Sequence, residues 1–117
     1  MYREIQIGEK TVPLLANGAT PFWYKQIFGK DLIAMINSSE DNVETLTQAA
    51  PELAFVMAKQ AECEKLEDMK NIGKDKYVEF LSGFEALDIQ MAIGEIIGVY
   101  MGNTVTSVIP KKKQAKK

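Results

Sequence analysis

Histidine is absent from this chain of 117 residues, and cysteine occurs once. Without histidine, the histidine-dependent catalytic triads, general bases and zinc sites are excluded. The lone Cys63 has no second cysteine with which to form an internal disulfide, which fits a reducing, cytoplasmic setting. Acidic neighbours, Glu62 and Glu64, are expected to raise the pKa of its thiol and make it a weak nucleophile. We therefore expect a protein that is not an enzyme and that holds no cofactor and no metal.

Long apolar runs are also missing. No stretch approaches the roughly 18 apolar residues that a membrane-spanning helix needs. The first four residues carry charge where a signal peptide has an apolar stretch. Hydrophobic residues make up 46% of the chain and charged residues 26%, values typical of a globular domain. We expect one globular domain over residues 1–110 and no contact with a membrane.

Charge is divided unevenly along the chain. Residues 1–110 hold 9 basic and 16 acidic residues, a net charge of −7, whereas residues 111–117 hold five lysines and no acid. An acidic body repels phosphate groups, so nucleic acid is not an expected partner of the body. The Lys-rich tail, residues 111–117, is expected to be disordered. The alternative is that this tail contacts nucleic acid or an acidic partner.

The N-terminal segment, residues 2–16, predicts a β-hairpin. Ile5 and Ile7 alternate with polar residues, and residues 8–10 supply a turn before an apolar return strand. Pro13 has no amide hydrogen, so its strand must be short or lie at an edge. A lone hairpin is only marginally stable, and this one is expected to pack on helices or to extend a partner's sheet.

Helical patterns dominate from residue 20 to residue 102. The first helix is expected to take Thr20 as its N-cap and to end at Gly29, and the last to take Asp88 as its N-cap. Gly83 is expected to end or kink a helix. Helical segments are expected over residues 22–28 and 30–36, the second resuming the first after Gly29, and over residues 43–49, 50 to about 71, 74–84 and 89–101. A short extended segment is expected over residues 104–109. The fold class is therefore α+β and predominantly α-helical, an N-terminal β-hairpin followed by four or five helices.

Aromatic residues are concentrated in the first helix. Phe22, Trp23, Tyr24 and Phe28 cannot all face one side of so short a helix, because residues 22–24 span most of a turn. Exposed aromatic side chains favour interfaces. One interpretation makes these residues a partner-binding surface, and the other makes them a small core covered by the hairpin.

Glycine recurs at every fourth position in the last helix, at Gly94, Gly98 and Gly102. Such spacing leaves a smooth groove that lets another backbone approach closely. We favour close packing within the monomer and keep a subunit contact as the alternative.

Several segments together resemble the tail assembly chaperones of long-tailed bacteriophages and prophages of Gram-positive bacteria. The similar segments are the hairpin, the aromatic helix that begins Thr20-Pro21, the helical residues 53–58, residues 80–84 and the lysine end. The resemblance implies a small, mainly helical, non-catalytic adaptor. Such a protein binds the tape measure protein and recruits tail tube subunits. It also self-associates, acts in the cytoplasm of the bacterial host and is absent from the mature virion.

Many members of this family are made in two lengths by ribosomal frameshifting, which raises the hypothesis that this chain is the short product of such a pair. Lysine codons are A-rich, so residues 111–113 or residues 116–117 fit a slippery run. The alternative is that the lysines form a plain solubilising tail. The expected partner contacts come from the residues themselves rather than from the family: the aromatic side chains Phe22, Trp23, Tyr24 and Phe28, with Gly94 and Gly98 for the approach of a helix. The alternative function is a small helical regulatory protein that contacts nucleic acid through the Lys-rich tail.

Overall fold

The structure, a computed structural model, describes residues 2–37, 43–63 and 65–105. Its described part is an antiparallel hairpin followed by seven helices, which confirms the predicted α+β, mainly helical class. The predicted disordered tail, residues 111–117, and most of the predicted extended segment lie outside the described residues. The elements are β1 (Tyr2–Ile7), β2 (Lys10–Leu15), α1 (Thr20–Phe28), α2 (Leu32–Asn37), α3 (Val43–Glu62), α4 (Leu66–Lys70), α5 (Lys74–Ser82), α6 (Ala86–Met91) and α7 (Ile93–Val105).

The hairpin forms where the sequence predicts it. Ile7 pairs with Lys10 across a two-residue turn, and Gly8 has a left-handed φ of 64°. Short hairpin turns need a positive φ at their first position, which glycine adopts without strain. Alternate side chains of the two strands point to the same face and are buried there: Ile5, Ile7, Val12 and Leu14. The hairpin is therefore one layer with a covered face and an open face.

Backbone pairing leaves an open edge on each strand. In a two-residue hairpin the residues that flank the turn form a hydrogen-bonded pair, and bonded and non-bonded pairs then alternate. Pro13, opposite Glu4, therefore occupies a non-bonded pair, and its nitrogen faces the outer edge of β2. The prediction that Pro13 belongs to an edge strand is confirmed. On β1, the amides that face outward are those of Tyr2, Glu4 and Gln6.

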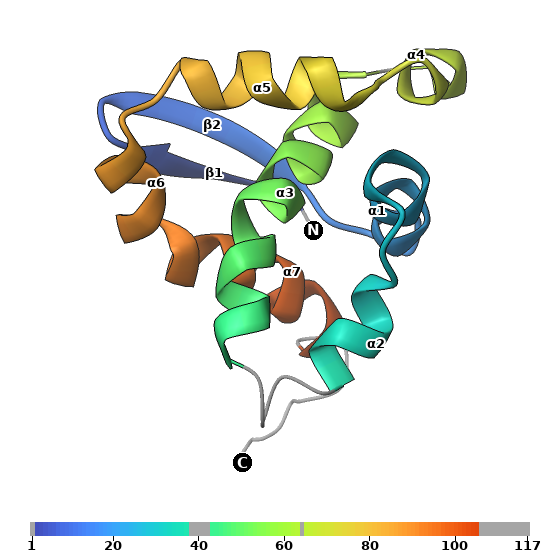
Figure 1. The fold of residues 1–117 in the computed structure, drawn as a ribbon, viewed down its shortest axis with the longest axis horizontal. Coiled ribbons are helices and arrows are strands. Elements are labelled where there is room, and N and C mark those ends of the chain that lie inside the picture. Colours follow the sequence, from blue (N-terminus) through green and yellow to red (C-terminus); the bar gives the residue numbers. More distant parts are fainter. Residues whose placement is uncertain (1, 38–42, 64, 106–117) are drawn as a thin grey trace.

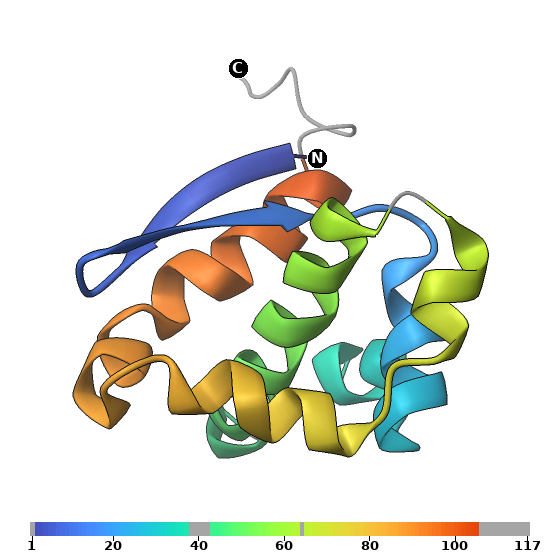
Figure 2. The same ribbon diagram turned by 90° about the horizontal axis from the view of Figure 1, so that it is seen from above.

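Helix α3 occupies the centre of the molecule (Figure 1). It packs against β2, α1 and α7, with α2 and α5 also in contact. Five consecutive α3 side chains, residues 53–57, are all buried. A surface helix buries only one stripe, so an uninterrupted buried run marks a helix enclosed on all sides. Figure 2 shows the hairpin as the outer layer on one face, with α3 and α7 behind it.

The predicted break between residues 49 and 50 is wrong, because α3 continues through Pro51. Proline inside a helix removes one hydrogen bond and costs about 3 kcal/mol. Ala49, Ala50 and Leu53 around it are all buried, and burial at this central position offsets that cost. The far boundary also differs, since α3 ends at Glu62 and residues 66–70 form a separate helix. Because the chain breaks between α3 and α4, Met69 of α4 is buried in the core.

Three further boundaries differ from prediction. Ala19, rather than Thr20, occupies the N-cap of α1, and Thr20 is buried. Asp88 lies inside α6, whose N-cap is Glu85, and its carbonyl accepts a hydrogen bond from the Ala92 amide where α6 gives way to α7. Helix α7 continues to Val105, so residues 104 and 105 are helical rather than extended. Gly29 and Gly83 end α1 and α5, as predicted.

We predict that Gly8→Ala lowers the free energy of unfolding by about 1–2 kcal/mol, because alanine is strained at a left-handed φ. A Cβ at this position also contacts the Asp88 carboxylate. Urea denaturation followed by circular dichroism measures the change. Gly18→Ala is the matched control, since φ there is not left-handed and no atom lies within 4 Å of an added Cβ. Equal effects of the two substitutions would contradict the role given to the turn.

Candidate partner-binding surfaces

The structure divides the aromatic residues of α1 into three buried side chains and one exposed side chain. Trp23, Tyr24 and Phe28 are 5%, 0% and 7% exposed, whereas Phe22 is 59% exposed. Of the two interpretations left open by the sequence, the core explains the three buried rings. Phe22 is the exposed member of the set, and its contact with a partner stays a prediction.

Tyr24 is held in the core by a polar contact at its tip. Its hydroxyl donates a hydrogen bond of 2.6 Å to Glu52, which also forms an ion pair of 3.1 Å with Lys30. Burial and this carboxylate raise the pKa of Tyr24 far above its usual range. Burial, followed by the charge of Glu52, raises the pKa of Tyr77 to about 12. Both phenols therefore stay neutral at physiological pH and act as structural groups.

Ring contacts extend the core from α1 across α3 to α5. Phe28 and Phe55 each meet the ring of Tyr77 edge to face, with centroids 5.0 and 5.4 Å apart, and Phe55 also meets Phe80. Edge-to-face geometry is favourable for aromatic pairs because a positive ring edge meets a negative face. The aromatic content therefore serves packing between helices that are distant in sequence.

A polar cluster, buried at Thr20 and Gln60, fixes the start of α1 against α3. The Thr20 hydroxyl donates to the Gln60 side-chain oxygen at 2.7 Å, and the Gln60 amide donates to the Asn17 side chain at 3.0 Å. The Asn17 backbone amide in turn donates to Thr20 at 3.0 Å. Sequence reasoning missed this cluster, because a glutamine in a helix and a threonine before proline carry no pairing signal.

Gly94 and Gly98 are exposed, and no atom of the described residues lies within 4 Å of a Cβ added at either position. The favoured prediction of close packing within the monomer is therefore wrong at these two glycines. Helix α7 buries another flank instead, through Ile96 and Val99. The two glycines lie on the outer surface of α7, and a subunit or partner contact there stays a prediction.

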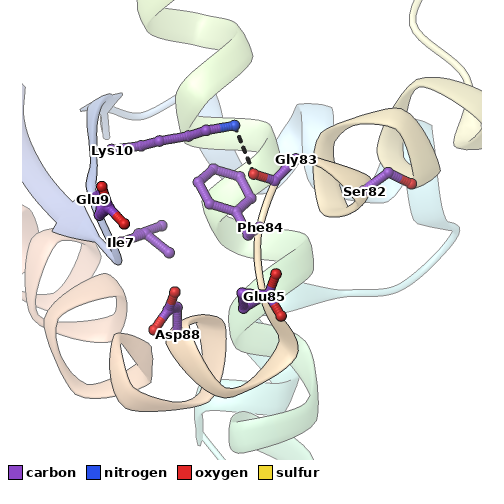
Figure 3. Close-up of a pocket in the computed structure, with 8 residues that line it drawn as sticks. All are labelled: Ile7, Glu9, Lys10, Ser82, Gly83, Phe84, Glu85 and Asp88. Atoms are coloured by element: carbon purple, nitrogen blue, oxygen red, sulfur yellow. Dashed lines mark hydrogen bonds between the residues drawn. The ribbon is translucent and has the colours of Figure 1, made fainter.

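A pocket of about 360 Å³ lies at the turn of the hairpin, between β2 and the start of α6 (Figure 3). Lys10 crosses it, donates a hydrogen bond of 2.6 Å to the Gly83 carbonyl and lies 5.1 Å from the centre of the Phe84 ring. The other charged side chains in its wall are carboxylates: Glu9, Glu85 and Asp88. The pocket is therefore suited to a cationic group more than to an anion.

A second hollow, of about 290 Å³, lies beside β1. Gln6 lines it from the strand, and Met91 and Glu95 line it from α6 and α7. Met91 is 76% exposed, and Leu87, one helical turn earlier, is 64% exposed. Sequence reasoning missed both residues, because their spacing of four is equally typical of the buried face of a helix.

No group of three or more potential metal ligands converges among the described residues. Burial, followed by the nearby carboxylates Glu62 and Asp68, raises the pKa of the Cys63 thiol, which keeps it protonated. No described helix is both long and apolar enough to cross a membrane.

Comparison with known proteins leaves the chain without a match. No protein-family model matches the sequence, no curated protein is similar to it, and no solved structure shares its fold at a significant level.

We predict that Trp23→Ala lowers the free energy of unfolding by about 3–5 kcal/mol, because it empties a buried site as large as an indole ring. Phe22→Ala, at the neighbouring position of the same helix, is the matched control and is expected to cost less than about 1 kcal/mol. Urea denaturation of both variants measures the difference. Similar losses in the two variants would show that the burial pattern of α1 differs from the one described.

Proposed function

We propose that this chain is a non-catalytic adaptor of the phage tail assembly chaperone kind, one that binds the tape measure protein and recruits tail tube subunits. The observation that carries the proposal is that two apolar side chains of α6, Leu87 and Met91, are 64% and 76% exposed, and that Met91 lines the hollow beside β1. Large exposed apolar side chains in a small domain are typical of surfaces that bind other proteins.

An unassembled tail subunit exposes apolar surface, and the exposed apolar side chains of α6 are suited to contact it. An adaptor that holds a subunit before polymerisation must cover apolar surface on the unassembled partner, and it must release the partner later. Two exposed apolar anchors supply contact area, and an open strand edge supplies backbone hydrogen bonds. The resemblance noted in the sequence supplies the identity of the partners, and self-association belongs to the same expectation.

The alternative is a small regulatory protein that contacts nucleic acid through the Lys-rich tail. The net charge of −7 over residues 1–110 makes it the lesser candidate. Binding by the lysines alone would weaken steeply with salt and would vanish on deletion of residues 111–117. A filter-binding titration at two salt concentrations, with and without these residues, tests it.

We predict that the double substitution Leu87→Ser, Met91→Ser weakens binding to the tape measure protein of the same phage by at least about tenfold, since exposed apolar anchors dominate such interfaces. Co-expression followed by calorimetry on the purified partners gives the dissociation constant. Val78→Ser on α5 is the matched control, because Val78 is 61% exposed but lies on another helix. Thermal melting checks that all variants fold alike.

Two outcomes would overturn the proposal. Absence of binding by the unchanged chain would remove the adaptor function. Equal weakening by Val78→Ser would remove the surface to which the function is assigned.

The frameshift hypothesis has its own test. Expression of the native gene with its downstream DNA, followed by intact-mass spectrometry, reports whether a minor longer product shares the chain up to the lysines and then diverges. A single product of 13.1 kDa would contradict the frameshifted pair.

A further inference from the structure

The outer edge of β1 is a row of backbone groups that β2 does not use. Within the described residues β1 pairs with β2 alone, and the register directs the amides and carbonyls of Glu4 and Gln6 away from β2. Unpaired strand edges tend to accept another strand, and proteins normally cover or interrupt them. Pro13 interrupts the outer edge of β2, whereas β1 contains no proline.

The geometry of a strand edge specifies what can cover it. Its outward amides and carbonyls recur at every second residue, and the backbone of another extended segment presents its own groups with the same repeat. A helix cannot pair with them, because its backbone groups are already bonded within the helix. The occupant that fits the outer edge of β1 is therefore an extended segment.

The hollow beside β1 lies where side chains of such a segment would point. Gln6 and Gly8 line it from the hairpin, and residues of α6 and α7 line it from the helix layer. In Figure 1, β1 lies between β2 and α7, and β1 contacts both α6 and α7. The buried side chains Ile5 and Ile7 point toward this layer. Side chains at one level of paired strands share a face, so the residues of the segment beside Ile5 and Ile7 would point toward the hollow.

The walls of this hollow suit a long basic side chain. Met91, which is 76% exposed, and Ala92 give it an apolar side, and Asp88 and Glu95 contribute carboxylates. Neither carboxylate forms an ion pair with another described residue. Lysine and arginine combine an apolar stem with a charged head, so the stem can lie on Met91 while the head reaches the carboxylates. An acidic side chain would meet like charge in the same place.

Charge differs between the two ends of the edge. Arg3 lies near the start of β1, whereas the carboxylates of Asp88 and Glu95 lie near the hairpin turn. Lys10, the basic residue next to the turn, donates its hydrogen bond to the Gly83 carbonyl on the other side of the hairpin. A basic residue of the segment is therefore favoured at the end of β1 that leads into the turn, which fixes the position of the segment along the edge.

A second copy of this chain is a poor occupant for the edge. A strand added to β1 would lie over α7, because α7 contacts β1 and continues the helix layer on that side (Figures 1 and 2). Antiparallel pairing with the β1 of another copy would bring the α7 of that copy to the same place. Paired strands are about 4.8 Å apart, whereas packed helix axes need about 8–10 Å. The edge therefore suits a segment of a different protein that carries no helix at that position.

We propose that the outer edge of β1 binds an extended segment of the adaptor's partner as a third strand, and that this segment directs a lysine or arginine side chain into the hollow between Asp88, Met91 and Glu95. The inference rests on the proposed function, because it names the part of the partner that this surface binds. Backbone pairing supplies affinity whatever the sequence of the segment, and the basic side chain selects the segment and its register.

A matched pair of proline substitutions tests the edge. Gln6 and Thr11 lie opposite each other, their amides point to opposite outer edges, and their side chains share one hydrogen bond of 2.7 Å. Gln6→Pro and Thr11→Pro therefore remove the same side-chain contact and no hydrogen bond between the strands, but each blocks a different edge. Calorimetry with the tape measure protein of the same phage is expected to show binding at least about tenfold weaker for Gln6→Pro and less than about twofold weaker for Thr11→Pro. Equal binding by the two variants overturns the proposal.

Amide hydrogen exchange on the unchanged chain is a second measurement, which needs no variant to fold. The amides of Glu4 and Gln6 are expected to exchange at least about tenfold more slowly in the complex than in the free chain, and the amide of Thr11 is expected to change little. A complex that forms without this protection overturns the strand pairing and leaves the adaptor function in place, whereas absence of any complex overturns both. Protection in the free chain that falls on dilution assigns the edge to a second copy and also overturns the proposal.

The basic side chain of the segment has a separate readout in the same binding assay. Glu95→Gln removes one carboxylate from the hollow and is expected to weaken binding at least about threefold at low salt. Glu67→Gln is the matched control, because it removes the same charge from an exposed position on α4. Equal effects of the two variants would overturn the assignment of a basic side chain to the hollow.

Discussion

Enclosure of α3 is the constraint on which the rest of the structure depends. Residues 53–57 of α3 are buried without interruption, so every side of that helix needs a cover. The hairpin covers one side, α1 and α2 another, α7 a third, and α5 contributes its aromatic face. A two-stranded sheet would be marginal alone, and it is stable here because α3 and α7 take up its apolar face. Continuity of α3 through Pro51 follows from the same constraint.

Local patterns were sufficient for the class of the fold and for many of its boundaries. Alternation at Ile5 and Ile7 and the glycine turn predicted the hairpin, and Gly29 and Gly83 predicted two helix ends, because each depends on neighbouring residues alone. The errors occurred where tertiary contacts override local preference. Pro51 signals a helix start, yet burial on both sides of it keeps one helix. Asp88 is a good N-cap residue, yet it lies inside α6 next to the hairpin turn.

The candidate site was harder to predict than the fold. The sequence indicated the aromatic residues of α1, but it left open whether they face a core or a partner, and that depends on which elements surround α1. Tyr24 reaches Glu52 and Thr20 reaches Gln60, across 28 and 40 residues of sequence, which no local pattern reports. Gly94 and Gly98 were recognised as a groove, but whether anything fills a groove is decided by the rest of the fold. Leu87 and Met91 stand out only once their exposure is known.

Pro13 makes the two edges of the hairpin unequal as sites for adding another strand. A sheet with two receptive edges can add subunits at both ends without limit, which is how strand pairing leads to fibres. Here the edge of β2 has lost a donor at its middle, whereas the edge of β1 keeps its donors. Strand addition is therefore favoured at the edge of β1 over the edge of β2, so the chain is better suited to end a growing sheet than to extend it. A protein that works beside a polymerising structure benefits from an edge of this kind, because each encounter yields a complex of finite size.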